Sequence, residues 1–448
     1  MFTDAEAERY RADFHRVREI VSAASGVDDA PTTQRPLAES DALLALVADD
    51  RVALARYQEA LLATLSFGSE PTVSVLAANP AVALYAGHVR TFEPHALEVG
   101  ADMALEWCAR EIPEGAMEAA VFRRPGAPLA IVNLPVPAPG PGQVLLRSIA
   151  VGLCGTDAHA FTGHFPLPTP IVLGHEMVGV IEAIGPGVEA LRAGDRVGVR
   201  WIQRTCGTCP ACARGAETRC PEPTSWIENG GGLSELVVVE ASGCTKIPDT
   251  LASELASPLF CAGHVAMSAL RRARPERGER VAVLGFGGLG HLAVQIARAE
   301  GHEVVAVTSS EEKARDARSL GAGEALVANG NPGEALASIG CADVIVATTS
   351  SMADVGAAVA GLRDGGRLVV VGLGEGSLAI DPAELVQREA ALLGSVQGPV
   401  AELEQVLDLA ARGLVVPRVE TFPLHLLNRA LGRLMSGRVR YRSVIQVG

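Results

Sequence analysis

Four closely spaced cysteines constrain the fold of this chain more than any other feature. Cys206, Cys209, Cys212 and Cys220 form a CxxCxxCx7C run. Four thiolates at this spacing can close a tetrahedron around Zn²⁺, and metal binding then supplies folding free energy to a lobe with little apolar core. The run therefore predicts a structural zinc site.

A second group of potential metal ligands lies on either side of this run in the sequence. Cys154 stands in VGLCGTD, His175 and Glu176 stand in LGHEMVG, and Cys261 stands in LFCAG. Two thiolates and one imidazole leave one position of a zinc ion open to an alcohol or carbonyl oxygen. Taken singly, Cys261 is also typical of a core thiol, His175 of a buried donor and Glu176 of an arginine partner. Together with the thiolate run, the group predicts a catalytic zinc site.

Residues 281–290, VAVLGFGGLG, have the pattern of a buried strand that runs into a dinucleotide-binding turn. The first glycine permits the tight turn, the second lets the backbone approach a pyrophosphate, and the last lets the following helix pack on the strand. A second strand is expected at 303–308. The expected contacts to the nucleotide are Gly285, Gly287, Gly288, Leu289 and Gly290, together with Val371 at the end of the strand RLVVVGL.

The end of that second strand indicates which nucleotide is bound. NAD sites commonly place an Asp or Glu there to bind the ribose hydroxyls. This chain instead has Thr308, Ser309 and Ser310, followed by Lys313, one of its two lysines. Hydroxyls and a cation suit a 2′-phosphate, so we expect NADP(H) in preference to NAD(H). The alternative is a helix capping box that begins at Ser309, and the two glutamates before Lys313 would repel a phosphate that they faced.

Changes in residue pattern along the chain predict three structural regions. Strands alternate with helices over 273–402, as in βαβ units on a doubly wound parallel sheet. Residues 117–272 have short β-branched runs separated by Pro and Gly, and 403–448 add a helix and short strands that return to this β part. Residues 1–116 show helical periodicity and carry no metal cluster or phosphate loop. We expect that segment to be a small all-α extension used in folding or oligomerisation.

Charge and cysteine usage exclude several classes of function. The net charge is −14, and residues 1–118 hold 20 acids and 9 arginines. An acidic chain does not suit nucleic acid or an anionic membrane as a partner. No apolar run approaches the roughly 20 residues of a membrane span, and we see no signal-peptide core. Six of the nine cysteines fall at ligand positions, so we expect reduced thiols and a cytoplasmic location.

From Met117 onward, the motifs GxCGTD, GHE, CxxCxxCx7C, CAG and GxGGLG resemble those of the medium-chain, zinc-dependent alcohol dehydrogenases. The resemblance implies a GroES-like catalytic domain around an inserted Rossmann domain, and a homodimer or homotetramer. It implies that Cys154, His175 and Cys261 bind catalytic zinc, the Cys₂His set of alcohol dehydrogenases, with Glu176 as a fourth or exchanging ligand. With the four-cysteine site, two zinc ions per chain are expected.

The same resemblance suggests the groups that move the proton. Thr156 matches the proton-relay hydroxyl of the family, and His159 matches a common family histidine near the cofactor. A second relay histidine of some members falls on Thr162, so delivery through water or His164 stays open. Val265 stands where family members often carry a threonine. The stretch TSSEEK resembles the NADPH-dependent aldehyde-reductase branch.

Three functions follow from these patterns. The favoured one is an NADP(H)-dependent enzyme that interconverts a small-molecule alcohol and an aldehyde or ketone. The second is an NAD-dependent polyol or amino-alcohol dehydrogenase on the same fold. The third is a non-catalytic, zinc-stabilised binding protein whose acidic N-terminal segment recruits a partner, although an open zinc site is not needed for binding alone.

Overall fold

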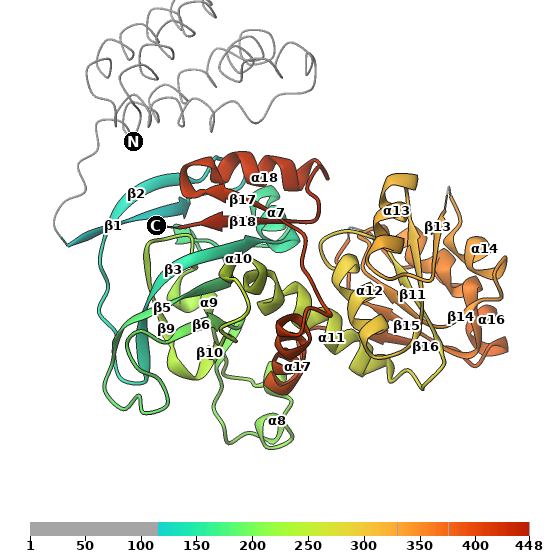
Figure 1. The fold of residues 1–448 in the computed structure, drawn as a ribbon, viewed down its shortest axis with the longest axis horizontal. Helices are drawn as coiled ribbons and strands as arrows, with labels where there is room; N and C mark the ends of the chain where they lie inside the picture. The colour runs from blue at the N-terminus through green and yellow to red at the C-terminus, as the bar shows by residue number, and fades with distance from the viewer. Residues whose placement is uncertain (1–114, 329, 375, 448) are drawn as a thin grey trace, which may run out of the picture. The chain divides into compact units, whose positions relative to one another are not determined.

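The computed structural model describes residues 115–328, 330–374 and 376–447 (Figure 1). The helices expected before residue 115 lie outside these ranges. The chain divides into two units, and in the described ranges the first unit comprises 115–136, 155–172 and 422–438. The second unit comprises the remaining described residues. None of the helices in this part of the chain has both the length and the apolar character needed to cross a membrane.

The first unit contains a small antiparallel sheet in the order β2-β1-β4. Helix α18 packs against helix α7 in the same unit. Buried Asn428 of α18 accepts a hydrogen bond from the Leu129 N–H at 2.9 Å and donates one to the Leu129 carbonyl at 3.0 Å. One amide side chain therefore ties two segments 299 residues apart. The elements are β1 (Ala116–Phe122), β2 (Ala130–Pro135), α7 (Gly155–Thr162), β4 (Ile171–Val172), η5 (Leu424–Leu426) and α18 (Leu427–Met435).

The second unit begins with a seven-stranded sheet built around β3, which pairs with β5, β9 and β18. Most of β3 is buried, in keeping with its apolar sequence QVLLRSIAVGL. The C-terminal strand β18 runs antiparallel to β3, with Ser443 opposite Leu153. The segment after the parallel sheet therefore returns to the β part. The strands are β3 (Gln143–Leu153), β5 (Glu176–Ile184), β6 (Arg196–Val199), β9 (Leu236–Glu240), β10 (Cys244–Lys246), β17 (Val419–Pro423) and β18 (Arg442–Gln446).

Short elements lie between these strands in the sequence. A two-stranded sheet of β7 and β8 lies on either side of the four-cysteine run in the sequence. These elements are β7 (Ile202–Arg204), α8 (Pro210–Ala213), η1 (Glu217–Arg219), β8 (Thr224–Ser225), α9 (Trp226–Asn229), η2 (Ala241–Gly243), α10 (Ser253–Ala256) and η3 (Ser257–Phe260).

A six-stranded parallel sheet follows in the order β13-β12-β11-β14-β15-β16. This is the 3-2-1-4-5-6 order of the Rossmann fold, in which the strand order reverses between the first and fourth strands. The predicted doubly wound sheet is confirmed, and the second strand has the expected bounds. The strands are β11 (Arg280–Leu284), β12 (Glu303–Thr308), β13 (Glu324–Val327), β14 (Ala342–Ala347), β15 (Leu362–Val370) and β16 (Ala391–Gly394).

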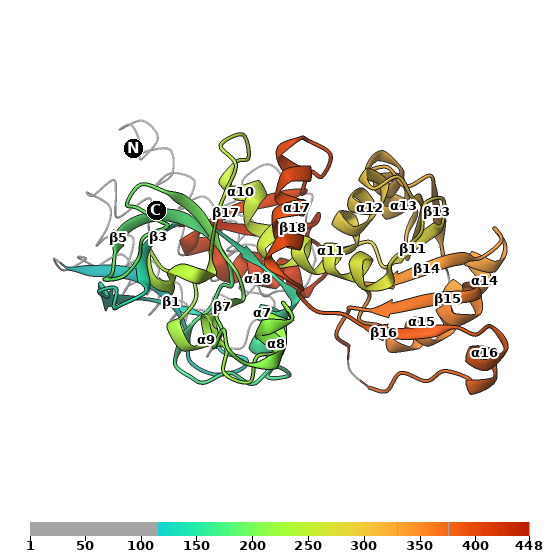
Figure 2. The same ribbon diagram turned by 90° about the horizontal axis from the view of Figure 1, so that it is seen from below.

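Alternate residues of the parallel strands belong to two separate apolar cores. Val281 and Val283 pack in the core that includes α11, α12 and α17, whereas Ala282 and Leu284 pack in the core that includes α14 and α15. Figure 2 shows α12 and α13 on one side of this sheet and α15 and α16 on the other. Because both faces are covered, the strands are continuously apolar. The helices are α11 (Ala262–Ala273), α12 (Gly290–Ala299), α13 (Glu311–Ser319), α14 (Pro332–Ala337), α15 (Met352–Ala357), η4 (Ala358–Gly361), α16 (Pro382–Gln387) and α17 (Val400–Ala411).

Candidate active site

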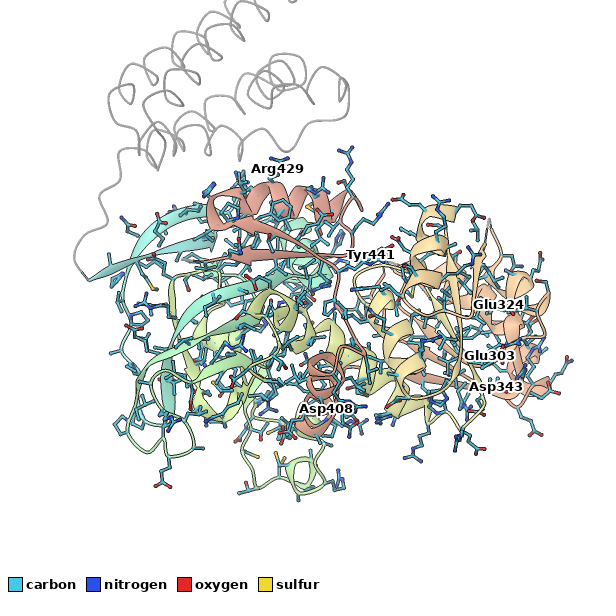
Figure 3. All side chains as sticks on the ribbon, viewed as in Figure 1. Glu303, Glu324, Asp343, Asp408, Arg429 and Tyr441 are labelled. Atoms are coloured by element: carbon cyan, nitrogen blue, oxygen red, sulfur yellow. The ribbon has the colours of Figure 1, made fainter. Side chains whose placement is uncertain are left out.

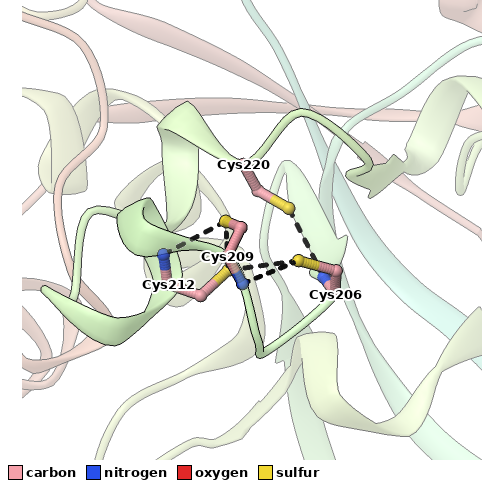
Figure 4. A group of neighbouring side chains, drawn as sticks. All are labelled: Cys206, Cys209, Cys212 and Cys220. Atoms are coloured by element: carbon pink, nitrogen blue, oxygen red, sulfur yellow. Dashed lines mark hydrogen bonds between the residues drawn. The ribbon is translucent and has the colours of Figure 1, made fainter.

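The four cysteines of the run come together in one cluster. Figure 4 shows the side chains of Cys206, Cys209, Cys212 and Cys220 directed toward one another, and their sulfur atoms all lie within 4.8 Å of one another. Cys209 caps α8, whose first residue is Pro210, and its sulfur accepts a hydrogen bond from the Cys212 N–H. A proline at the first position of the helix fixes this turn.

Backbone N–H groups favour the thiolate form in this cluster. The Cys209 N–H lies 3.4 Å from the Cys206 sulfur, and the Cys206 N–H lies 3.4 Å from the Cys220 sulfur. Hydrogen bonds from the backbone of Thr208 and Cys209 lower the pKa of Cys206 to about 6. The eight cysteines in the described ranges are all free thiols. A closed set of four sulfur donors, supported by backbone donors, fits a structural zinc ion.

The second group of ligands is also brought together. The ligand atoms of Cys154, His175, Glu176 and Cys261 all lie within 4.8 Å of one another. Antiparallel pairing explains the approach of the first three, because Gly152 near the end of β3 lies opposite Glu176 at the start of β5. Cys261 comes from another part of the chain, at the N-cap of α11.

Two tryptophans that the sequence analysis did not single out position the imidazole. The ring of His175 is fully buried and meets Trp201 edge-on, with centroids 4.8 Å apart. On another side, Trp226 stacks on His175 with an interplanar angle of 28° and centroids 5.7 Å apart. These contacts restrict rotation of the ring, so its nitrogens are oriented before any metal binds.

Glu176 forms a buried ion pair with Arg442, the first residue of β18. Glu176 Oε1 accepts a hydrogen bond from Arg442 Nη2, and the exposed fractions of the two side chains are 0% and 6%. Burial raises the pKa of Glu176 to about 7, although the Arg442 charge acts in the opposite direction. Oε2 has no hydrogen-bond partner among the described residues. Glu176 therefore has the arginine partner that the sequence alone also allowed, and its second carboxylate oxygen is still available to a metal.

The two sulfurs of this group are hydrogen-bonded to each other, and their pKa values shift in opposite directions. A hydrogen bond with Cys261 lowers the pKa of Cys154 well below its usual range, and His175 and Arg442 act in the same direction. The same contact with Cys154 raises the pKa of Cys261. A divalent cation bound there would balance the charge of two thiolates, and the Arg442 guanidinium lies beside the Glu176 carboxyl. The donor set therefore fits Zn²⁺ with three protein ligands and an open position.

The glycine loop has the local geometry that a pyrophosphate requires. Gly285 directly follows β11 and has φ +94°, a conformation that L residues rarely adopt, and a Cβ on Gly290 would overlap the Gly285 carbonyl oxygen. A Cβ on Gly287 would meet nothing within 4 Å, whereas one on Gly288 would lie 2.8 Å from Arg442 Nη1. Leu289 is the N-cap of α12, and Val371 lies directly after β15. The loop thus combines a tight turn, open space and a nearby cation.

The residues predicted to select the nucleotide lie at the end of β12 and the start of α13. Thr308 is the last residue of β12, and its buried hydroxyl has no hydrogen-bond partner within the described residues. The helix cap that was the alternative interpretation is present but begins one residue later, because Ser310 and not Ser309 is the N-cap of α13. Ser310 has extended backbone angles, and its Oγ accepts from the Lys313 N–H at 3.3 Å. The Ser310 O–H can still donate to a ligand.

The glutamate next to Lys313 has a partner of its own. Glu312 pairs with Arg440 at 2.9 Å on the surface, which lowers the pKa of the Glu312 carboxyl. Its charge is therefore partly offset. Thr156 and His159 lie in α7, which begins at the residue after Cys154, and both are half-buried.

Models of known families match two ranges of the chain. The alcohol dehydrogenase GroES-like domain matches residues 140–249, and the zinc-binding dehydrogenase domain matches 288–412. An alcohol dehydrogenase from Geobacillus stearothermophilus is 38% identical over 338 residues, which are 74% of this chain and the whole of the relative. The chain belongs to the medium-chain, zinc-dependent alcohol dehydrogenase family. This membership confirms the predicted fold class and the expected dehydrogenase activity.

Relatives within the family differ in nucleotide. An NADP-dependent alcohol dehydrogenase C from Mycobacterium bovis is 34% identical over 319 residues, covering 69% of this chain and 92% of the relative. The structure of acetophenone reductase from Geotrichum candidum in complex with NAD is 28% identical, with a TM-score of 0.67. It is matched over 75% of this chain and 98% of its own. The alcohol dehydrogenase family therefore supports a nicotinamide cofactor and zinc without selecting the nucleotide.

Proposed function

We propose that this alcohol dehydrogenase interconverts an alcohol and an aldehyde or ketone, with NADP(H) as the preferred nucleotide and Cys154, His175 and Cys261 as ligands of a catalytic zinc. The approach of these ligand atoms and Glu176 to within 4.8 Å of one another carries the proposal. A zinc ion held there supplies Lewis-acid polarisation of the substrate oxygen, and the nicotinamide supplies or accepts the hydride.

Several side chains of this chain would position the metal and the substrate for this reaction. Trp201 and Trp226 pack against the His175 ring and would orient it toward a bound zinc, and the ion pair with Arg442 holds the Glu176 carboxylate beside the same position. Glu176 Oε2, which has no hydrogen-bond partner in the described part of the chain, would be available as a fourth ligand of the zinc when no substrate is bound. The Thr156 hydroxyl holds the proton of the substrate oxygen and passes it toward His159. The four-cysteine cluster would hold the second, structural zinc.

The preference for NADP(H) is supported by the end of β12. The strand ends in Thr308 and not in a carboxylate, Thr308 offers a buried hydroxyl, and Lys313 lies in the first turn of α13. A 2′-phosphate gains charge-assisted hydrogen bonds from such a set, whereas a ribose hydroxyl lacks the carboxylate that usually accepts from it.

Initial rates with a panel of aliphatic and aromatic aldehydes, measured with NADPH and with NADH, test the proposed function. We expect kcat/KM to be at least about tenfold higher with NADPH, the value of one charge-assisted contact. Equal rates, or faster polyol oxidation with NAD⁺, would favour the NAD-dependent polyol dehydrogenase. Absence of turnover with either nucleotide in zinc-loaded protein would favour the binding protein.

Further features of the enzyme are proposed on the same basis. We divide it into a helical extension over 1–116, a catalytic domain over 117–272 and 403–448, and a nucleotide domain over 273–402. We expect a homodimer or homotetramer, which sedimentation equilibrium would test. A reducing compartment such as the cytoplasm suits the six cysteines assigned to zinc. No nucleic-acid or membrane partner is proposed.

A further inference from the structure

His291 follows the glycine fingerprint directly and is the second residue of α12. Its side chain is fully buried, and the chemistry described above makes no use of it. Both ring nitrogens are engaged. Nδ1 lies 3.0 Å from the carbonyl oxygen of Gly287, and Nε2 lies 3.2 Å from the backbone nitrogen of Arg418.

These two partners determine where the ring carries its proton. A backbone N–H can only donate, so Nε2 of His291 accepts from Arg418. A carbonyl oxygen can only accept, so Nδ1 carries the hydrogen and donates it to Gly287. Burial lowers the pKa of His291 to about 3, which keeps the ring neutral near pH 7. The imidazole is therefore held as one tautomer with one donor, and that donor points at the glycine loop.

The orientation of the ring is fixed by packing. Tyr441, labelled in Figure 3, stacks on His291 with centroids 5.2 Å apart and an interplanar angle of 25°. The Tyr441 hydroxyl donates to Asp316 at 2.5 Å, and its ring meets Phe286 edge-on with centroids 5.1 Å apart. Rotation of the imidazole would disturb this stack and break both of its hydrogen bonds.

The hydrogen bond from His291 determines how one peptide of the loop is turned. The Gly287 carbonyl accepts from the backbone N–H of His291 at 3.1 Å as well as from the ring. In a trans peptide, the N–H of the next residue points opposite to the carbonyl. Holding the Gly287 carbonyl toward α12 therefore turns the Gly288 N–H away from His291. Backbone N–H groups of such loops are the donors that bind phosphate oxygens.

We propose that His291 is a positioning residue that holds the Gly287–Gly288 peptide with its N–H presented to the pyrophosphate of the nicotinamide nucleotide. This inference rests on the nucleotide site of the proposed function. It does not depend on the choice between NAD and NADP, because both contain the pyrophosphate. His291 acts through Gly287 and does not contact the nucleotide itself.

The chain offers a matched control one turn further along α12. Gln295 is buried, donates to the His291 carbonyl at 2.9 Å and the Val416 carbonyl at 3.2 Å, and accepts from the Val416 N–H at 2.9 Å. Gln295→Met removes buried hydrogen bonds to the segment that also contains Arg418. It leaves the His291 Nδ1 donor to Gly287 in place. It therefore measures how nucleotide binding responds to the loss of these neighbouring hydrogen bonds alone.

Calorimetric titration of the zinc-loaded enzyme with NADPH and with NADH tests the proposal. His291→Phe keeps the aromatic stack and removes both hydrogen bonds, so Kd rises about three- to tenfold for both nucleotides alike. His291→Asn, whose amide can donate in place of Nδ1, restores Kd to within about twofold of the wild type. Gln295→Met lowers Tm and leaves Kd unchanged. In steady state, His291→Phe raises the nucleotide KM and leaves kcat nearly unaltered.

Unchanged Kd values in a folded His291→Phe enzyme would overturn the proposal, and so would an equal weakening in Gln295→Met. If the phenylalanine variant does not fold, the comparison of His291→Leu with His291→Asn provides the same contrast between lost and retained donor. Equal binding of NADH and NADPH by the wild type contradicts only the proposed nucleotide preference. The comparison of His291 variants still tests whether His291 positions the Gly287–Gly288 peptide.

Discussion

Glu176 and Arg442 form a buried ion pair that joins the first residue of β5 to the first residue of β18, 266 positions later in the chain. The same arginine lies beside Gly288 in the glycine loop. One guanidinium therefore contacts a candidate metal ligand and the edge of the nucleotide loop. Removing either partner leaves an uncompensated charge in the interior.

We predict that Glu176→Gln destabilises the enzyme by about 3 kcal/mol, because it removes the carboxylate that pairs with the buried Arg442 guanidinium. Denaturant titration measures the change. Glu182→Gln is the control, since its pair with Arg147 is half exposed on both sides and is worth less than about 1 kcal/mol. Equal losses of stability in the two variants would show that the buried Glu176–Arg442 pair contributes no more to stability than the exposed Arg147–Glu182 pair.

Gly152→Ala should disturb the catalytic metal site. A Cβ at this position would overlap the Glu176 carboxylate, so we expect a loss of stability of about 1–3 kcal/mol and lower zinc occupancy. Gly394→Ala provides the comparison, because a Cβ there meets nothing within 4 Å. Full zinc content in Gly152→Ala would contradict the close packing of Glu176 on β3.

His291 should make stability depend on pH. Its pKa is lowered in the folded state to about 3, whereas the unfolded chain takes up the proton near pH 6.5, so stability falls as pH falls between these values. Relative to the wild type, His291→Phe is less stable at pH 7. That difference narrows by about 2–3 kcal/mol at pH 4.5, at roughly 1.4 kcal/mol per pH unit. A constant difference across this range would mean that His291 titrates normally.

Lys313→Ala should weaken NADPH more than NADH, by about ten- to a hundredfold, because only NADPH carries the 2′-phosphate that the ammonium offsets. Thr308→Asp should shift preference toward NADH, since a carboxylate repels phosphate and accepts from ribose hydroxyls. Kd values for both nucleotides measure these effects. An equal loss of affinity for both nucleotides in Lys313→Ala would show that the TSSEEK stretch caps α13 and does not select the nucleotide.

Local spacing predicted the parts of the site that depend on few residues. The CxxCxxCx7C run and the GxGGLG turn specify short-range geometry, and the structure brings both into the expected arrangements. Arg442 could not be found in this way, because its pairing with Glu176 depends on the register of β18 against β3. Arg442, directly before the apolar run SVIQV, was the available signal, since a buried charge requires a partner.

Other details depended on backbone angles and packing. The shift of the cap from Ser309 to Ser310 reflects which residue has extended backbone angles, and two adjacent serines carry the same sequence signal. The positioning of His175 by Trp201 and Trp226 depends on loops that meet only in the folded chain. The role inferred for His291 required both of its hydrogen-bond partners to be located.

Zinc content measured together with NADPH-dependent turnover of an aldehyde tests the central claim most directly. We expect two zinc ions per chain in the wild type. In Cys154→Ser we expect one zinc ion per chain and a loss of turnover of about a thousandfold or more, because a Lewis acid contributes several kcal/mol. Cys209→Ser should instead lose stability first. Full turnover in Cys154→Ser, or a single zinc in wild-type enzyme prepared without chelator, would contradict the account.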